Sequence, residues 1–266
     1  MIIDFHTHCF PERIAEMAVS RVAGAAGITI VGNGTVDSLI SEMDRQGIDM
    51  AVVLNIATNP RQQTNVNNFA IEINNKEGRI ISFGSVNPDS DNITSELKRI
   101  KTAGLKGIKI HPDYMGVPVD DRRMIRILEE CADLDLIVVT HAGFDVISPD
   151  FIHATPEGIA RAVKGIRGLK LVAAHMGGNR CWEDVERYLL GRDIYFDISV
   201  ESKDDIPHNL AKRIIDGHPS DKILFGSDAP WFSPAGSISL IESLGLAEEQ
   251  KVNIYEHNAK KLLGIC

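Results

Sequence analysis

Eight short apolar runs recur along the chain, and segments with helical spacing of apolar residues separate them. Several runs, such as 51–54 and 136–139, are apolar throughout, which is typical of parallel strands that are covered on both faces. The expected strands are Ile2–Asp4, Met50–Asn55, Ile80–Val86, Gly107–Ile110, Leu136–Thr140, Lys170–Ala174, Ile194–Ile198 and Ile223–Phe225.

Helix-start signals precede three of the intervening segments: Thr35, the pair Asp120-Asp121, and Thr155 followed by Pro156. Capping side chains and a proline at the first helical position favour the start of a helix. After Thr35 the apolar residues follow at i, i+3, i+4 and i+7, which predicts a face that packs against the sheet.

Strands that alternate with helices about 30 residues apart predict an α/β fold, a (β/α)8 TIM barrel that forms a single domain over residues 1–266. A doubly wound open sheet is the alternative. It would normally carry a glycine-rich phosphate turn after its first strand, where this chain has His-Thr-His-Cys. The segment 27–34 lies in the long first connection, and we interpret it as a small flap over the site.

The composition is that of an ordinary globular protein, with 44% hydrophobic and 24% charged residues, so disordered and fibrous classes are excluded. A net charge of -9 without a basic run argues against a nucleic-acid partner. No signal peptide or membrane-spanning run is present, so we expect no membrane partner. Four cysteines without a Cys-x-x-Cys pair suit reduced thiols in the cytoplasm. The sequence leaves the oligomeric state open, and a homodimer is compatible with it.

The first apolar run leads into Asp4-Phe5-His6-Thr7-His8. In an extended strand side chains alternate, so we expect Asp4, His6 and His8 on one face and Phe5 and Thr7 on the other. Two imidazoles that converge on one small volume suit a metal ion, because neutral imidazole is a common ligand for zinc and similar ions.

Four further strands finish on residues that can bind metal or move protons: His111, His141, His175 and Asp228. Barrel active sites lie at the C-terminal ends of the strands, so these groups are expected at one mouth together with the first two histidines. Buried polar groups need partners, and an ion is the simplest partner for six of them. The other histidines are assigned no chemistry: His153, His208, His218 and His257.

Together these motifs resemble the amidohydrolase superfamily. The resemblance is closest to the amidohydrolase-related branch that contains aminocarboxymuconate-semialdehyde decarboxylase, resorcylate decarboxylases and pyrone-dicarboxylate lactonase. It rests on Asp4-x-His6-x-His8, Gly107-Ile-Lys-Ile-His-Pro112, His141-Ala-Gly143, His175-Met-Gly-Gly178, Phe225-Gly-Ser-Asp-Ala-Pro230 and Asn258-Ala-Lys-Lys-Leu-Leu-Gly264.

The resemblance implies one divalent metal ion, with zinc expected first and manganese as the alternative. It implies that His6, His8, His141 and Asp228 are the metal ligands and that His175 is the general acid or base. Two-metal members bridge their ions at the fourth strand, where Lys109 would serve as a carbamate. A second metal is the less favoured interpretation, because Lys109 lies a layer deeper than His111.

An ion with an open coordination position lowers the pKa of bound water from 15.7 toward about 7 and polarises a nearby carbonyl. We therefore expect His175 and Asp228 to be catalytic, since His175 can move the proton and Asp228 can also orient the water. His111, with Asp113 and Tyr114 near it, is expected to contact the substrate or developing negative charge.

The expected activity is hydrolysis of a C-N, C-O or C-C bond in a small, carboxylated substrate, and nonoxidative decarboxylation is an alternative. Arginine favours bidentate contacts with carboxylates, so Arg180 and Arg61 are the candidates to bind one. Trp231 and Phe144 are candidates to line an apolar pocket. The assigned substrate-binding residues are His111, Arg180 and Trp231.

Three rival functions are consistent with parts of the pattern. A TatD-type deoxyribonuclease shares the size, fold and opening His-x-His, but it usually carries Thr-Asp near the eighth strand, and this acidic chain lacks a phosphate-binding stripe. A phosphotriesterase-like lactonase would require two bridged metals. A noncatalytic metal-binding barrel cannot be distinguished by fold alone, because function depends on the site.

Overall fold

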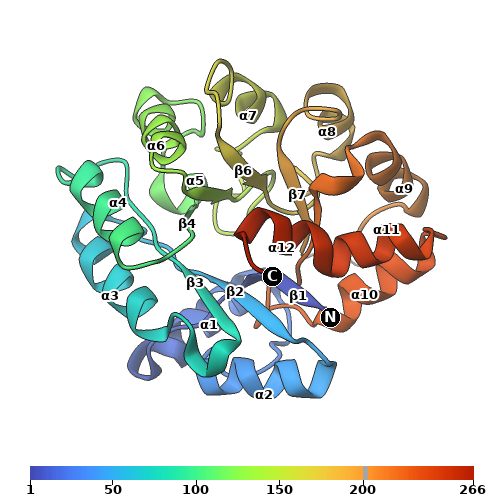
Figure 1. The fold of residues 1–266 in the computed structure, drawn as a ribbon, viewed down its shortest axis with the longest axis horizontal. Coiled ribbons are helices and arrows are strands. Elements are labelled where there is room, and N and C mark those ends of the chain that lie inside the picture. The colour runs from blue at the N-terminus through green and yellow to red at the C-terminus, as the bar shows by residue number, and fades with distance from the viewer. Residues whose placement is uncertain (200–202) are drawn as a thin grey trace.

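In the part of the chain that the structure describes, eight parallel strands form a ring at the centre of the molecule (Figure 1). The computed structural model describes residues 1–199 and 203–266. The strands are β1 (Ile3–Thr7), β2 (Met50–Leu54), β3 (Ile80–Phe83), β4 (Gly107–Ile110), β5 (Ile137–Thr140), β6 (Lys170–Ala173), β7 (Tyr195–Ile198) and β8 (Ile223–Phe225).

Backbone hydrogen bonds close the ring at two seams between the sets β1 to β3 and β4 to β8. At one seam Gly84 N donates to Gly107 O at 2.9 Å, and at the other Asp228 N donates to His6 O at 2.8 Å. The predicted (β/α)8 barrel is therefore confirmed, and the alternative of an open sheet is wrong. The second seam also joins two predicted site residues through their backbones.

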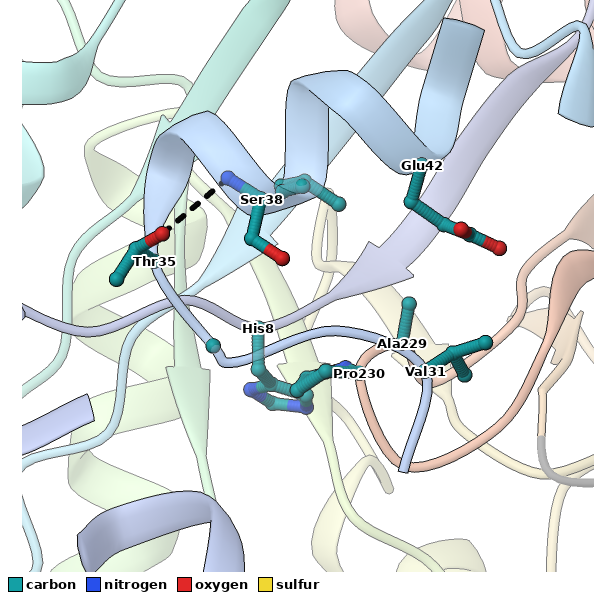
Figure 2. A pocket seen from close by; sticks show the side chains of 9 residues that line it. His8, Val31, Thr35, Ser38, Glu42, Ala229 and Pro230 are labelled. Carbon is teal, nitrogen blue, oxygen red and sulfur yellow. Dashed lines mark hydrogen bonds between the residues drawn. The ribbon is translucent and has the colours of Figure 1, made fainter. Parts of the chain in front are cut away.

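Helices surround the ring (Figure 1). Thr35, Asp121 and Thr155 each cap the helix that follows, as predicted, and Figure 2 shows Thr35 facing the backbone nitrogen of Ser38. In the described part of the chain no helix is long and apolar enough to cross a membrane. The helices are α1 (Glu12–Ala26), α2 (Val36–Gln46), α3 (Gln63–Ile73), α4 (Ile93–Thr102), α5 (Pro112–Met115), α6 (Arg122–Asp133), α7 (Pro156–Ala162), α8 (Trp182–Tyr188), α9 (His208–Gly217), α10 (Pro234–Ser243), α11 (Glu248–Val252) and α12 (Asn258–Leu263). The 3-10 helices are η1 (Pro60–Gln62), η2 (Lys76–Gly78) and η3 (Ser220–Lys222), and η4 (Asn253–His257) is a π-helix.

The strand β1 contains a bulge that the sequence pattern does not reveal. Asp4 pairs with Ala51 and Thr7 pairs with Val53, so three steps along β1 match two along β2. An extra residue of this kind breaks the alternation of side chains between the two faces. The strand also runs further than expected and includes His6.

The bulge corrects the predicted faces of β1. Phe5 points into the barrel, where its ring packs edge-on against Phe83 at 6.0 Å, and His6 points into the cavity just above it. Asp4 lies on the other side, where its carboxylate accepts hydrogen bonds from the backbone N–H and the hydroxyl of Ser227. The prediction that Asp4 shares a face with His6 is therefore wrong.

An apolar layer fills the barrel below the cavity, and α12 covers its N-terminal end (Figure 1). Asn258 fixes α12 there, because its side-chain amide donates to Ser220 O at 2.9 Å and to Ile223 O at 2.8 Å, at the start of β8. This arrangement leaves the opposite end of the barrel for polar residues. The layer comprises Ile3, Phe5, Val52, Leu54, Phe83, Ile137, Val139, Val172, Tyr195 and Leu224, joined by Ala259, Leu262 and Leu263 of α12.

Candidate active site

A cavity of about 220 Å³ opens at the C-terminal end of the barrel. A water molecule takes up about 30 Å³ in the liquid, so the cavity has room for a small organic molecule. All the residues assigned to the site from the sequence line it: His6, His8, His111, His141, His175, Arg180, Asp228 and Trp231. Lys109, Tyr114, Phe144 and Asp145 line it as well.

His6, His8 and Asp228 offer three ligand atoms that all lie within 4.8 Å of one another. The Asp228 Oδ1 atom is 3.1 Å from His8 Nε2 and 3.4 Å from His6 Nε2. Asp228 adopts a left-handed backbone with φ of 62°, which aspartate tolerates better than most residues. The loop after β8 thus turns its carboxylate back over β1.

The outer nitrogens of these two rings are occupied by acceptors. His8 Nδ1 lies 2.8 Å from Leu54 O, and His6 Nδ1 lies 3.0 Å from Asp197 Oδ2. A carbonyl or an ionised carboxylate only accepts, so both protons are assigned to Nδ1. With its proton on Nδ1, each ring presents an unprotonated Nε2 to the Asp228 Oδ1 atom, and a cation between these two nitrogens and this oxygen would satisfy all three atoms.

His175 and His141 face each other across the cavity wall, with 3.0 Å between His175 Nε2 and His141 Nδ1. His175 opens the turn after β6, where its φ of 58° and that of Met176, 55°, are both left-handed. Gly177 follows with φ of 84°, and a side chain there would meet the Phe196 ring at 2.8 Å. The His-Met-Gly-Gly sequence thus forms a tight turn that holds the His175 ring at the cavity.

Among the described residues, the buried His141 Nε2 has no hydrogen-bond partner, and neither has Oδ2 of Asp113. His141 Nε2 lies 4.0 Å from Oδ2 of Asp113 and 4.0 Å from Oδ2 of Asp145. The structure groups His141 with His111 and Asp145, rather than with the ligand atoms of His6 and His8. A buried polar atom without a partner is unfavourable, so this nitrogen fits a site for a cation. Its role as a ligand stays a prediction.

His111 has the opposite arrangement of its ring proton. Its Nδ1 accepts a hydrogen bond from the backbone N–H of Tyr114 at 3.4 Å, so the proton lies on Nε2, which is 3.6 Å from Asp145 Oδ2. The ring is stacked between Tyr114, at 3.6 Å, and His141, at 4.2 Å. His111 is therefore a hydrogen-bond donor toward the cavity, and its contact with substrate stays a prediction.

Burial sets the charge state of these groups. It lowers the pKa of His6, His111, His141 and His175 well below 6.5, so the four rings are neutral at pH 7. Burial also lowers the pKa of Lys109 to about 8, against the opposing effect of nearby carboxylates. It raises the pKa of Asp145 to about 6.

Two buried side chains of the site were missed by the sequence interpretation. Asp197 and Ser199 are fully buried at the C-terminal end of β7, behind His6 and His175. The only signal in the sequence is the aspartate that interrupts the run Tyr-Phe-Asp-Ile. A carboxylate inside an otherwise apolar strand needs a buried partner, which could have identified it.

The candidate substrate contacts differ in position. The guanidinium of Arg180 lies 5.0 Å from the centre of the Phe144 ring, and both residues line the cavity. The Trp231 ring lies 5.0 Å from that of His8, and its Nε1 donates to Val19 O in α1. Arg61 lies in η1, outside the residues that line the cavity.

The segment 27–34, interpreted as a flap, forms part of the cavity wall. Ile28 lines the cavity, and Val31 N donates to Pro230 O at 2.7 Å. Figure 2 shows Val31 beside Ala229 and Pro230, in the small pocket that they share with His8. The loop after β8 and the first connection are thus joined next to a predicted metal ligand.

Solved structures with the same fold include several enzymes. An uncharacterized TIM-barrel protein from Bordetella bronchiseptica has a TM-score of 0.78 at 17% identity, over 99% of this chain and 98% of that one. A dihydroxybenzoic acid decarboxylase from a Polaromonas species, with bound manganese and the inhibitor 2-nitroresorcinol, has a TM-score of 0.73 at 16% identity, over 99% and 96%. A probable 2-pyrone-4,6-dicarboxylic acid hydrolase from Acinetobacter baumannii, with citric acid bound, has a TM-score of 0.68 at 17% identity, over 99% of both chains.

Identities this low show the fold alone. A comparison with proteins of curated function finds no match. The family model described as amidohydrolase, in contrast, matches residues 3–265, from the first strand to the end of α12. The match covers every strand end that carries a site residue. The chain therefore belongs to the amidohydrolase family of enzymes.

Proposed function

We propose that this protein is a metal-dependent hydrolase that cleaves a C-N, C-O or C-C bond in a small, carboxylated molecule. The observation that carries the proposal is the convergence of His6 Nε2, His8 Nε2 and the Asp228 carboxylate on one cavity beside His175. Proteins of the amidohydrolase family bind a divalent metal.

These residues fit such an ion. The donor set is neutral imidazole and carboxylate, which suits zinc first and manganese as the alternative. The unpartnered Nε2 of His141 supports its place as a further ligand. When bound, the ion would polarise a substrate carbonyl and lower the pKa of water.

The protein's own groups would then handle protons and charge. His175 is neutral at pH 7, and its Nε2, which faces His141 in the structure, would take up a proton and return it to the leaving group. Asp228 would orient the attacking water by accepting a hydrogen bond. His111, as a donor at Nε2, would stabilise negative charge that develops on the substrate.

Arg180 and Trp231 would select the substrate. In the described part of the cavity lining, Arg180 and Lys109 are the two basic side chains apart from the histidines, and Arg180 lies toward the loops. A guanidinium can hold a carboxylate through two parallel hydrogen bonds. Trp231 and Phe144 supply apolar walls for the rest of the molecule. We place the enzyme in the cytoplasm, where its four free cysteines would stay reduced.

A substrate screen tests the proposal. Protein reconstituted with zinc or manganese is incubated with carboxylated amides, esters and lactones, and separately with aromatic carboxylic acids, while acid production and carbon dioxide release are measured. We expect hydrolysis that requires the ion and is lost in His175→Asn. Release of carbon dioxide without any hydrolysis would assign the alternative, nonoxidative decarboxylation. Cleavage of an oligodeoxynucleotide would contradict the proposal.

A further inference from the structure

The end of β7 places a carboxylate directly behind two histidines of the site. Asp197 is fully buried, and its Oδ2 atom lies 3.0 Å from Nδ1 of His6. Its other oxygen, Oδ1, accepts a hydrogen bond from the backbone N–H of His175 at 3.1 Å. A single carboxylate therefore contacts both the first predicted ligand and the predicted general base.

Ser199 extends this contact to the His175 ring. Its hydroxyl donates to Asp197 Oδ1, and its Oγ lies 2.8 Å from His175 Nδ1 and 3.0 Å from His6 Nδ1. The one hydroxyl proton is used by the carboxylate, so toward both rings Oγ can only accept. The backbone carbonyl of Ser199, 3.3 Å from His175 Nδ1, can also only accept.

These contacts determine where the ring protons lie. His6 and His175 must each donate from Nδ1, so each Nε2 is unprotonated. His175 Nε2 then accepts from His141 Nδ1, 3.0 Å away, which leaves His141 Nε2 unprotonated as well. In this assignment the buried His141 Nε2, which has no hydrogen-bond partner among the described residues, carries a free lone pair.

We propose that Asp197 is a positioning residue that determines which ring nitrogen carries the proton. It acts on His6 directly and on His175 and His141 through Ser199. The carboxylate itself lies behind the rings, whereas the unprotonated Nε2 atoms face the cavity. Carboxylate groups behind ligand histidines commonly hold the ring in the metal-binding form. The metal is the only part of this inference that rests on the proposed function.

Asp197→Asn tests the inference with little change in shape. The fixed backbone N–H of His175 keeps the amide oxygen on its side, so the amide NH₂ faces His6 Nδ1 and requires that nitrogen to accept. We expect the His6 proton to move to Nε2. The protonated nitrogen of each histidine is read by ¹⁵N NMR of metal-free, histidine-labelled protein, with His6→Gln used to assign the signals.

The same spectra contain an internal control, because His8 contacts Leu54 O and Asp228 and not Asp197. We expect the His8 signals of the two proteins to be the same. Glu96→Gln is the matched control for loss of a buried carboxylate, since Glu96 is bound to Asn67 and Arg99 away from the cavity. Its histidine signals should equal those of the wild type.

Metal affinity supplies the second readout. Calorimetric titration of the metal-free proteins with zinc chloride should show a 10–100-fold weaker affinity in Asp197→Asn and no change in Glu96→Gln. An unchanged His6 signal in a folded Asp197→Asn protein would overturn the inference, whatever its activity. A shifted signal with unchanged zinc affinity would leave the protonation role intact and would contradict the proposed metal site instead.

Discussion

The Nζ atom of Lys109 lies 3.3 Å from Nε2 of His6. A buried amine therefore faces the nitrogen that the proposed ion would bind. Lys109 is fully buried on β4 with its pKa lowered to about 8 by that burial, so most of the population carries a proton at pH 7. An ammonium group has no lone pair for a metal ion, so conversion to a carbamate would be needed for Lys109 to bridge two ions.

The ion count distinguishes these two states of Lys109. We expect one divalent ion per chain by elemental analysis, with no increase when bicarbonate is added during reconstitution. Lys109→Gln should retain that ion, because the predicted ligands are other residues. Two ions per chain, with the second lost in Lys109→Gln, would instead support the carbamate bridge.

His175→Asn should separate catalysis from metal binding. The substitution removes the proton acceptor at Nε2, so we expect kcat to fall by about 10²–10⁴ while the ion content stays that of the wild type. His218→Asn is the matched control, because His218 is a buried histidine outside the cavity lining. Full activity of His175→Asn would reject the acid-base assignment.

Asp228→Ala should lose the ion itself. The carboxylate lies 3.1 Å from His8 Nε2 and completes the three-residue group, so its removal should weaken zinc affinity by more than the 10–100-fold typical of outer contacts. Calorimetric titration of the metal-free protein measures this. Wild-type affinity in the variant would show that the ion lies elsewhere.

Arg180→Ala should act on substrate binding. A charge-assisted hydrogen bond contributes about 1.5–3 kcal/mol, so KM for a carboxylated substrate should rise about 10–100-fold while kcat changes little. Arg61→Ala, an exposed arginine outside the cavity lining, is the control. An equal KM in both variants would exclude Arg180 as the carboxylate contact.

The stability of the fold should depend on pH through His218. Its pKa is lowered by burial, where it stacks on Phe196 and its Nε2 donates to Ile194 O at 2.9 Å. Below pH 6.5 the unfolded chain binds a proton that the folded protein does not, so this contribution to stability is present above pH 6.5 and is lost as pH falls.

His218→Gln retains a donor for the Ile194 carbonyl but cannot titrate. As the pH falls below 6.5, we therefore expect the free energy of unfolding of the wild type to decrease relative to that of the variant, by up to about 1.4 kcal/mol per pH unit. Urea denaturation at pH 7.5 and 5.5 measures the difference. A difference that does not change with pH would contradict the assignment.

The strands and helices could be predicted from the sequence for a simple physical reason. Buried parallel strands are apolar throughout, and caps such as Thr35 and Asp121 act within their own turn of helix. The cavity residues could be predicted because the active-site residues of such barrels lie at the C-terminal ends of the strands. These signals depend on residues that are close together in the sequence, so they can be recognised without the tertiary structure.

The contacts that orient the side chains of the site could not be predicted from the sequence, because they join segments that are far apart in the chain. Asp197 contacts His6 across 191 residues of chain, and no spacing rule relates the two. The grouping of His141 with Asp145 and Asp113 depends on how the loops after β4 and β5 pack together. The faces of β1 were predicted incorrectly because a bulge depends on pairing with β2.

Because of its extra residue, β1 contributes adjacent side chains to both the apolar layer and the cavity. It lets the adjacent residues Phe5 and His6 enter the interior together, one for the apolar layer and one for the cavity. Removal of a single residue here would restore strict alternation and turn one of the two toward the helices. Alignments and designs that transfer this motif to another barrel should therefore count positions backward from the histidine pair, and not forward from the start of the strand.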